Sequence, residues 1–141
     1  MSIETTEPGA EVIPDLDSQE FWDRAATGAT TFSYQVCDSC GNQQFPPLAL
    51  CRRCHAEELT WSDAPLDAVV RSWITVNHPI YPYLVDAVPY RVVLAEAAPH
   101  LRVLARWRSD VEPSLGLPVE LAIGPGEAGP MPVAEPKADA S

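Results

Sequence analysis

Hydrophobic and polar residues alternate in several segments of the second half of the chain, which is the pattern of β-strands that bury one face. These segments are Ala68 to Asn77, Tyr90 to Glu96, Leu101 to Arg108 and Val119 to Ile123. In the third segment the apolar residues share one face, namely Leu101, Val103, Ala105 and Trp107. Short strands separated by turn signals predict a small barrel or sandwich rather than a repeated βα unit.

The first of these strands has two candidate faces. One face carries Val69, Arg71, Trp73 and Thr75, and the other carries Val70, Ser72, Ile74 and Val76. Because side chains alternate along a strand with a period of two, we expect each set to keep to its own side. Pro65 marks a boundary before this strand, near residues 62–66, and the β-domain is predicted over residues 63–123.

A short helix is predicted before the β-rich region, over residues 17–30. Asp17 or Ser18 would be its N-cap, and acidic residues occupy its first turn. Phe21, Trp22 and Ala25 form an apolar face. This face packs either on the rest of the chain or on a partner, and the pattern does not decide between them.

The net charge of −11 is concentrated at the two ends of the chain. Residues 1–36 hold seven acids and one Arg, and residues 111–141 hold five acids and one Lys. Residues 37–110 are close to neutral, with eight acids and seven arginines. We expect residues 1–16 to be a flexible acidic arm and residues 124–141 to be a disordered tail. Without a basic stripe, nucleic-acid binding loses its main source of affinity.

All four cysteines lie in two Cys-x-x-Cys pairs that are separated by ten residues, namely Cys37, Cys40, Cys51 and Cys54. Four thiolates on two tight turns can close a tetrahedral shell around one metal ion. A strand from Thr31 to Val36 leads into the first pair, and a strand from Leu59 to Trp61 follows the second. We therefore predict a zinc ribbon over residues 31–62, with these cysteines as the ligands. A shell closed by four sulfurs leaves no position for substrate, so the metal is predicted to be structural.

Other cysteine chemistries compete with zinc. Two disulfides suit small secreted chains, but residues 1–20 lack the basic start and the apolar run of a signal peptide, so we expect a cytoplasmic protein. A redox dithiol needs only one such pair. Rubredoxin-type iron uses the same turns, so iron stays open beside zinc. His55 directly follows the last cysteine and is interpreted as a neighbour of the site, because four sulfurs fill the shell.

Signals for catalysis by this chain itself are few. The histidines, which are His55, His78 and His100, are isolated in the sequence. The Gly-x-Ser-x-Gly elbow, a Gly-rich phosphate loop and a paired-carboxylate signature are all missing from the sequence. His78 is the best single candidate for chemistry, but a histidine that ends a strand before Pro79 is the more ordinary interpretation. We predict no catalytic residue.

The segment from His78 to Pro89 is more apolar than an ordinary surface loop. It either folds back and plugs the end of the barrel, or it faces a partner or an apolar acyl or sterol group. On the second interpretation the candidate contact residues, with those of the helix, are Phe21, Trp22, His78, Ile80, Tyr81, Tyr83 and Leu84. Four arginines of the β-region either bind phosphates of coenzyme A or pair with local acids on the barrel exterior, namely Arg91, Arg102, Arg106 and Arg108.

The order of these motifs resembles a known family. Cys-Asp-Ser-Cys-Gly at 37–41, Phe-Pro-Pro at 45–47 and Cys-Arg-Arg-Cys at 51–54 precede a β-domain that contains Val-Pro-Tyr-Arg-Val-Val-Leu-Ala-Glu at 88–96. Over residues 17–123 the chain is similar to the acyl-CoA-associated zinc-ribbon/OB-fold proteins, formerly a domain of unknown function. It departs from their pattern at His55, where such ribbons place Gly, and at residues 97–100, which lack the usual acidic residue and Gly.

The resemblance implies a mainly β fold, with an N-terminal helix, a rubredoxin-like zinc ribbon and a small OB-fold barrel. Phe45-Pro46-Pro47 is expected at the tip of the ribbon hairpin. Members of the family accompany thiolase-superfamily enzymes, including lipid-transfer-protein-like lyases that cleave steroid-CoA side chains by retro-aldol chemistry. The resemblance therefore implies a non-catalytic subunit of a heteromeric complex, such as a heterotetramer, with a CoA thioester as its substrate. Alternatives are a subunit of a thiolase-like acyltransferase or synthase, a stand-alone acyl-CoA-binding protein and an OB-fold nucleic-acid module.

Overall fold

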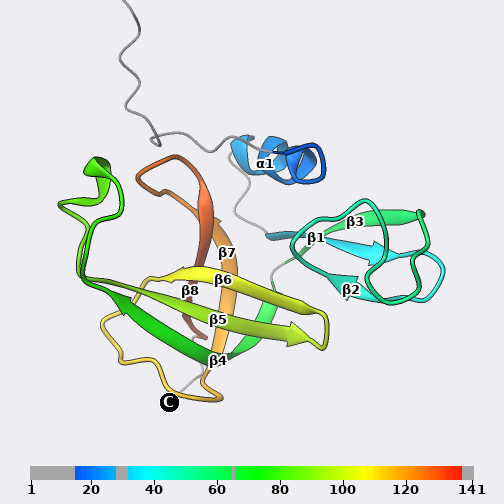
Figure 1. Cartoon of the computed structure of the whole chain (residues 1–141). Coiled ribbons are helices and arrows are strands. Elements are labelled where there is room, and N and C mark those ends of the chain that lie inside the picture. The colour runs from blue at the N-terminus through cyan, green and yellow to red at the C-terminus, as the bar shows by residue number, and fades with distance from the viewer. Residues whose placement is uncertain (1–14, 28–31, 65, 138–141) are drawn as a thin grey trace, which may run out of the picture.

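The computed structural model describes residues 15–27, 32–64 and 66–137, and Figure 1 shows its three parts. A helix, α1 (Gln19–Ala26), is followed by a three-stranded sheet and then by a closed barrel. Ser18 is the N-cap, which is one of the two residues predicted for it. Its hydroxyl makes no capping hydrogen bond, and the carboxylate of Asp15 accepts the Ser18 N–H (2.8 Å). Most of the predicted acidic arm lies outside the described residues.

The small sheet is built around β1 (Phe32–Cys37), which has β2 (Gln43–Gln44) on one side and β3 (Leu59–Ala64) on the other. Both pairings are antiparallel. The strands that were predicted to enter and leave the cysteine pairs are therefore present. The two cysteine turns lie at one end of this sheet, because Cys37 is the last residue of β1 and is paired with Leu59, the first residue of β3.

The barrel contains five strands and one short 3-10 helix. They are β4 (Leu66–Val76), η1 (Pro82–Leu84), β5 (Tyr90–Ala98), β6 (Leu101–Trp107), β7 (Pro118–Gly124) and β8 (Met131–Pro136). The strand order around the barrel is β4-β5-β6-β8-β7, and only the β6–β8 pair among these strands is parallel. Five strands closed in this Greek-key order form the OB-fold, which confirms the expected fold class.

The prediction of a disordered tail from residue 124 onward is wrong for the described residues 124–137. β8 pairs with β6 on one side and with β7 on the other, and its Ala134 is fully buried. The segment contains prolines at 132 and 136, which weakened its strand signal. The β-domain therefore extends beyond residue 123, and β8 is the strand that closes the barrel.

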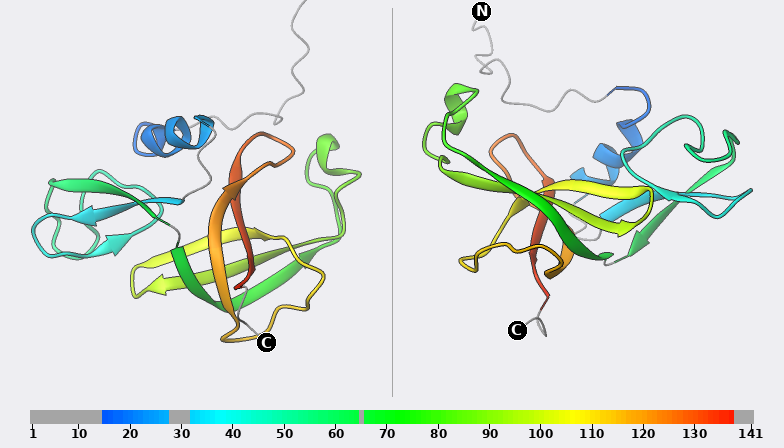
Figure 2. Two further views of the ribbon diagram at one scale, coloured as in Figure 1. Left: turned by 180° about the vertical axis from the view of Figure 1, so that it is seen from behind. Right: turned by 60° about the horizontal axis from the view of Figure 1, so that its bottom comes forward.

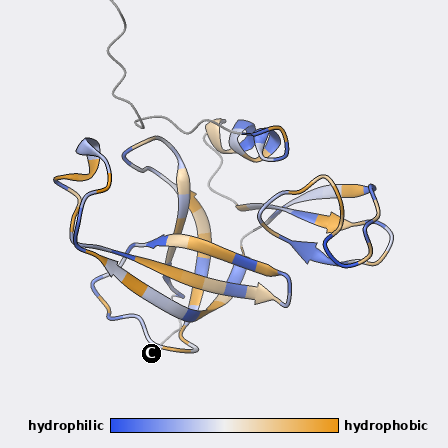
Figure 3. Ribbon diagram, in the orientation of Figure 1, coloured by the Kyte–Doolittle hydropathy of each residue, from blue (hydrophilic) through white to orange (hydrophobic). Residues whose placement is uncertain are grey.

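The predicted faces of β4 are also wrong, because a β-bulge interrupts the strand between Val70 and Ser72. Leu66, Ala68 and Val70 are buried before the bulge, whereas Trp73 packs against the core after it. One extra residue in the strand moves the alternation to the other face, so neither predicted set keeps to one side. β6 has no such interruption, and its predicted apolar face is buried as expected. Hydrophobic and hydrophilic stretches alternate along these strands in Figure 3.

One hydrophobic core connects the helix, the ribbon and the barrel. The ring centroids of Phe21 and Phe45 lie 5.1 Å apart, and those of Phe32 and Phe45 lie 4.9 Å apart. Phe45 also forms a β-bridge with Leu101, the first residue of β6. Phe45 was expected at a hairpin tip, but it lies at the junction of the two sheets, in contact with Phe21 of α1. Figure 2 shows α1 beside the small sheet, near the point where that sheet meets the barrel. Burial of these rings holds the ribbon against the barrel.

Candidate metal centre and partner-contact loop

Each Cys-x-x-Cys pair forms the same tight turn. The N–H of Gly41 donates to the carbonyl of Cys37, and the N–H of His55 donates to the carbonyl of Cys51, both over 2.9 Å. The residue after each second cysteine has a left-handed backbone, with φ of 77° at Gly41 and 64° at His55. Glycine adopts this conformation without steric cost, whereas histidine does not. The departure from the family pattern at His55 therefore falls on a conformation that favours glycine.

The four predicted ligands are brought together, since the Sγ atoms of Cys37, Cys40, Cys51 and Cys54 all lie within 4.8 Å of one another. The Sγ atoms of Cys37 and Cys54 are 3.6 Å apart, as are those of Cys40 and Cys51. A regular tetrahedron with metal–sulfur bonds of about 2.3 Å has sulfur–sulfur edges of about 3.8 Å. These residues therefore fit one tetrahedral metal ion. Cys37 and Cys51 are buried, and Cys40 and Cys54 form the exposed side of the site.

Backbone and side-chain N–H groups point at the sulfurs. The sulfur of Cys51 accepts from the backbone N–H of Cys54 (3.4 Å) and of Arg53 (3.3 Å), and from the side-chain amide of Asn42 (3.7 Å). The N–H of Cys40 donates to the sulfur of Cys37 (3.5 Å). The hydrogen bond from Cys54, together with that from Arg53, lowers the pKa of Cys51 to about 6. Such donors favour the thiolate, which is the form that binds metal.

A buried glutamine pair supports the second turn from below, and the sequence analysis missed it. The amide of Gln44, which is fully buried, accepts the N–H of Arg52 (2.7 Å) and donates to the carbonyl of Leu50 (3.1 Å). It also donates to Gln35 (3.0 Å), whose amide bonds both backbone groups of Leu48. These bonds fix the segment that carries Cys51. Glutamines are common on surfaces, so their role could be recognised only once β1 and β2 were paired.

Comparison with known proteins identifies the ribbon. Residues 24–60 match the family model of the ChsH2 rubredoxin-like zinc ribbon domain. The ribbon of this chain is therefore similar to that domain. The four cysteines are therefore positioned to hold one metal ion in a domain similar to a zinc ribbon, which supports a structural zinc site.

The likeness extends beyond the ribbon to the whole fold. Among solved structures, a chain of an Ltp2-ChsH2(DUF35) aldolase matches with a TM-score of 0.73 and 22% sequence identity. The match covers 89% of this chain and 98% of that chain, so the helix, ribbon and barrel share one arrangement. A search of curated proteins found no match.

Two of the predicted contact residues are not available at the surface. Phe21 is 2% exposed and packs in the core beside the ChsH2-type ribbon, and Leu84 is 8% exposed. Their assignment to a partner surface is therefore wrong, because both side chains are already covered by this chain. Trp22 is half-buried and lines a cavity of about 280 Å³ that Tyr83 and Met131 also line.

The loop between β4 and β5 leaves its other apolar residues in solvent. Ile80 is 70% exposed and Tyr81 is 45% exposed, while His78 is also exposed. The rings of Tyr81 and Tyr83 stack with an interplanar angle of 5° and a centroid distance of 5.5 Å. The loop therefore does not plug the barrel with these side chains. This segment, residues 78–89, lies at the far side of the barrel from the ribbon (Figure 1), and we call it the contact loop after its predicted role.

The arginines of the barrel are mostly paired with acids, as one of the two sequence interpretations expected. Arg102 bonds the carboxylate of Glu96 (2.6 Å), Arg91 bonds that of Glu112 (3.0 Å), and Arg106 bonds that of Glu127 (2.6 Å). Arg108 donates to the carbonyl of Pro125 instead (2.5 Å).

Among the described residues, no helix is long and apolar enough to cross a membrane.

Proposed function

We propose that the chain is a non-catalytic accessory subunit of a thiolase-fold lyase, which cleaves a steroid or other acyl-CoA side chain by a retro-aldol reaction. The observation that carries the proposal is the match of helix, ribbon and barrel to nearly the full length of a chain of an Ltp2-ChsH2(DUF35) aldolase. The ribbon family supports the same assignment independently. The partner is a lipid-transfer-protein-like enzyme, the assembly is a heterotetramer, and its substrate is a CoA thioester.

The closed metal site is consistent with a structural role for this subunit. Four sulfurs fill the tetrahedral shell, so no position remains for a substrate or an activated water molecule. The zinc fixes the ribbon and, through the shared aromatic core, the position of the barrel. The chemistry then belongs to the partner enzyme. Because the four thiols must stay reduced to bind zinc, we place the protein in the cytoplasm.

The contact loop is the part of the described surface that best suits a partner. Ile80, Tyr81 and Val85 are exposed apolar side chains within six positions, and the ring of Tyr83 stacks on that of Tyr81. Clustered apolar side chains in solvent are characteristic of protein interfaces, and tyrosine is enriched there. We therefore assign His78, Ile80, Tyr81 and Tyr83 to the interface with the enzyme.

Affinity purification of the tagged full chain from its native lysate, followed by mass spectrometry, tests this function. The expected result is a thiolase-fold protein in near-stoichiometric amount. The purified complex is then supplied with acyl-CoA thioesters. A carbonyl product from the side chain supports the lyase, whereas transfer of the acyl group supports the acyltransferase or synthase alternative. A chain that purifies alone contradicts the subunit assignment, and tight binding of acyl-CoA by that lone chain would favour the stand-alone binding protein.

A further inference from the structure

A cavity of about 360 Å³ opens at one end of the barrel, where β4 and β6 end and β5 begins. Side chains from all three strands and from the following loop line it, among them Thr75, Tyr90, Arg91, Arg106, Arg108 and Ser109. It is separate from the zinc site, which lies in the other sheet. The proposed function assigns no role to this cavity.

The charged side chains that line the cavity are all cationic, although the chain as a whole carries a net charge of −11. Arg91, Arg106 and Arg108 line it, and no acidic residue is among the described residues of its wall. The acids that pair with Arg91 and Arg106, which are Glu112 and Glu127, lie outside this wall. A guanidinium has five N–H donors, so one carboxylate does not exhaust it.

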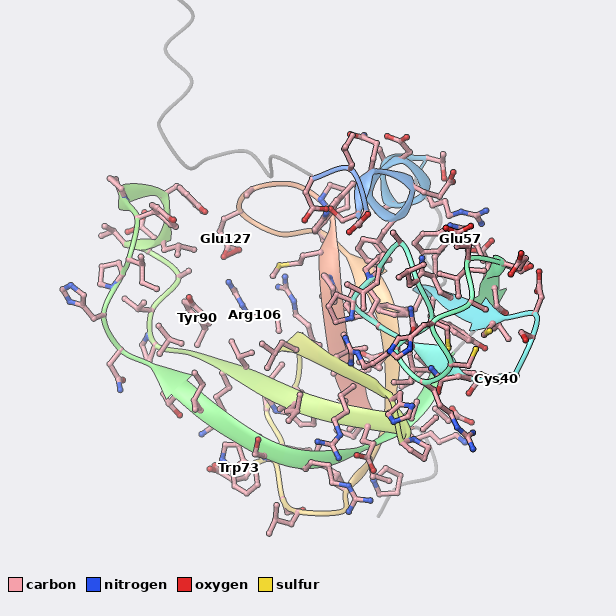
Figure 4. All side chains as sticks on the ribbon, turned by 45° about the vertical axis from the view of Figure 1, so that its right-hand side comes forward. Cys40, Glu57, Trp73, Tyr90, Arg106 and Glu127 are labelled. Carbon is pink, nitrogen blue, oxygen red and sulfur yellow. The ribbon has the colours of Figure 1, made fainter. Side chains whose placement is uncertain are left out.

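Arg106 is held in place before any ligand arrives. Its side chain is only 10% exposed, its guanidinium carbon lies 3.9 Å from the centre of the Tyr90 ring, and it bonds Glu127 over 2.6 Å. Figure 4 shows Tyr90, Arg106 and Glu127 gathered on one side of the barrel. Its Nε is buried and has no hydrogen-bond partner among the described residues. Because its neighbours fix the guanidinium, the N–H groups that Glu127 does not occupy are pre-organised to bind an anion in the cavity.

We propose that this cavity binds a phosphate-bearing ligand, with Arg91, Arg106 and Arg108 contacting the phosphate oxygens. The guanidinium groups of Arg91 in β5, Arg106 in β6 and Arg108 just after β6, together with the hydroxyls of Thr75 and Ser109, suit an anion with several oxygens and more than one charge. A single carboxylate has two oxygens, which one guanidinium fork can satisfy. The site belongs to this chain alone, so the inference does not depend on the partner enzyme.

Calorimetric titration of the full zinc-loaded chain with pyrophosphate tests the site. Arg91→Gln and Arg108→Gln each remove one charge-assisted contact and should weaken binding about tenfold. Arg71→Gln is the matched control, since Arg71 pairs with Glu96 and is not part of the cavity wall. The affinity of this variant for pyrophosphate should stay within about twofold of that of the wild type. Arg106 is left intact in these variants because its removal would leave the carboxylate of Glu127 without its ion-pair partner and disturb the fold.

The remaining arms separate phosphate from other anions. Inorganic phosphate should bind more weakly than pyrophosphate, and higher salt should weaken both, because the contacts are ionic. Succinate should bind at least about tenfold more weakly than pyrophosphate. The proposal is overturned if the wild type binds neither phosphate, if succinate binds as well as pyrophosphate, or if the Arg91→Gln/Arg108→Gln double variant binds like the Arg71→Gln control.

Discussion

The Nδ1 of His100 lies 2.7 Å from the Oδ1 of Asn42, which connects the β5–β6 hairpin of the barrel to the first cysteine turn of the ribbon. The same Asn42 side chain donates to the sulfur of Cys51 (3.7 Å) and to the amide oxygen of Gln44 (3.3 Å). Two residues that are 58 positions apart therefore join a barrel hairpin to a metal ligand. The zinc site is supported by the barrel as well as by its own turns.

Asn42→Ala should lower the zinc affinity by about tenfold, because outer hydrogen-bond partners of metal ligands typically contribute that much. The measurement is the transfer of zinc to a competing chelator at equilibrium. Asn77→Ala is the matched control, because Asn77 is exposed at the end of β4, in the other sheet. Equal zinc affinities for the two variants would contradict the role of the Asn42 side chain.

His55→Gly should stabilise the protein by about 1 kcal/mol, because His55 has a left-handed backbone that costs a non-glycine residue about that amount. The reverse change at the equivalent position, Gly41→His, should destabilise it by a similar amount. Urea unfolding of the zinc-loaded proteins measures both changes. A destabilised His55→Gly variant would show that the imidazole makes a contribution that outweighs the backbone strain.

A chain that stops after Pro130 should fail to fold its barrel, because it lacks β8. This strand supplies the partner of β6 on one side and of β7 on the other, and it buries Ala134. We expect no cooperative thermal transition for the barrel by circular dichroism. A chain that stops after Lys137 keeps all of β8 and serves as the control. Equal thermal midpoints for the two would mean that β8 is not needed to close the barrel.

The carboxyl of Glu96 accepts hydrogen bonds from Arg102 and Arg71, and these hold its pKa below its usual value. A lowered pKa in the folded state stabilises the protein above the unfolded value of about 4.3 and stops doing so as the pH falls through the folded value. Glu96→Gln should therefore be less stable than the wild type near neutral pH, and the difference should vanish in acid. Both proteins carry the same zinc ligands, so the comparison cancels the pH dependence of metal binding. A difference that does not change with pH would contradict this account.

Ile80→Asp should weaken assembly with the partner enzyme by at least about tenfold, because it places a charge in the centre of the contact loop. Ile80 is 70% exposed, so the isolated chain should keep its thermal midpoint. Leu115→Asp is the control, since Leu115 is 72% exposed in a different loop. Assembly is measured by size-exclusion chromatography with the co-purified enzyme. If the two variants assemble equally well, the contact loop is not the interface.

The parts of the fold that could be predicted from sequence are those with a local signal. The cysteine spacing identified the ribbon, and the uninterrupted alternation of β6 identified its buried face. The bulge in β4 inserts one residue without a glycine or proline to mark it, so its faces were assigned wrongly. β8 was missed because two prolines and neighbouring glycines resemble a tail, and its strand conformation depends on partners that are far away in the sequence.

For the predicted contact residues, local sequence patterns did not distinguish buried from exposed apolar side chains. Phe21 and Ile80 are both large apolar side chains in short segments, but Phe21 is buried against Phe45 and Ile80 is in solvent. Their difference depends on the docking of the ribbon onto the barrel, which no local pattern reveals. The burial of Arg106 under Tyr90 could not be predicted either, because strand alternation places it on the outer face of β6.

The position of β8 in the chain sets the order in which the protein can mature on the ribosome. The ribbon is complete once Ala64 has emerged, whereas the barrel has to wait for residues 131–136. At synthesis rates of about 5 to 20 residues per second, the ribbon precedes the closed barrel by roughly 4 to 15 seconds. During that interval the nascent chain can acquire its zinc, while Phe45 lacks its β-bridge partner until Leu101 arrives. The availability of zinc therefore affects the folding of the nascent ribbon before the barrel has been synthesised.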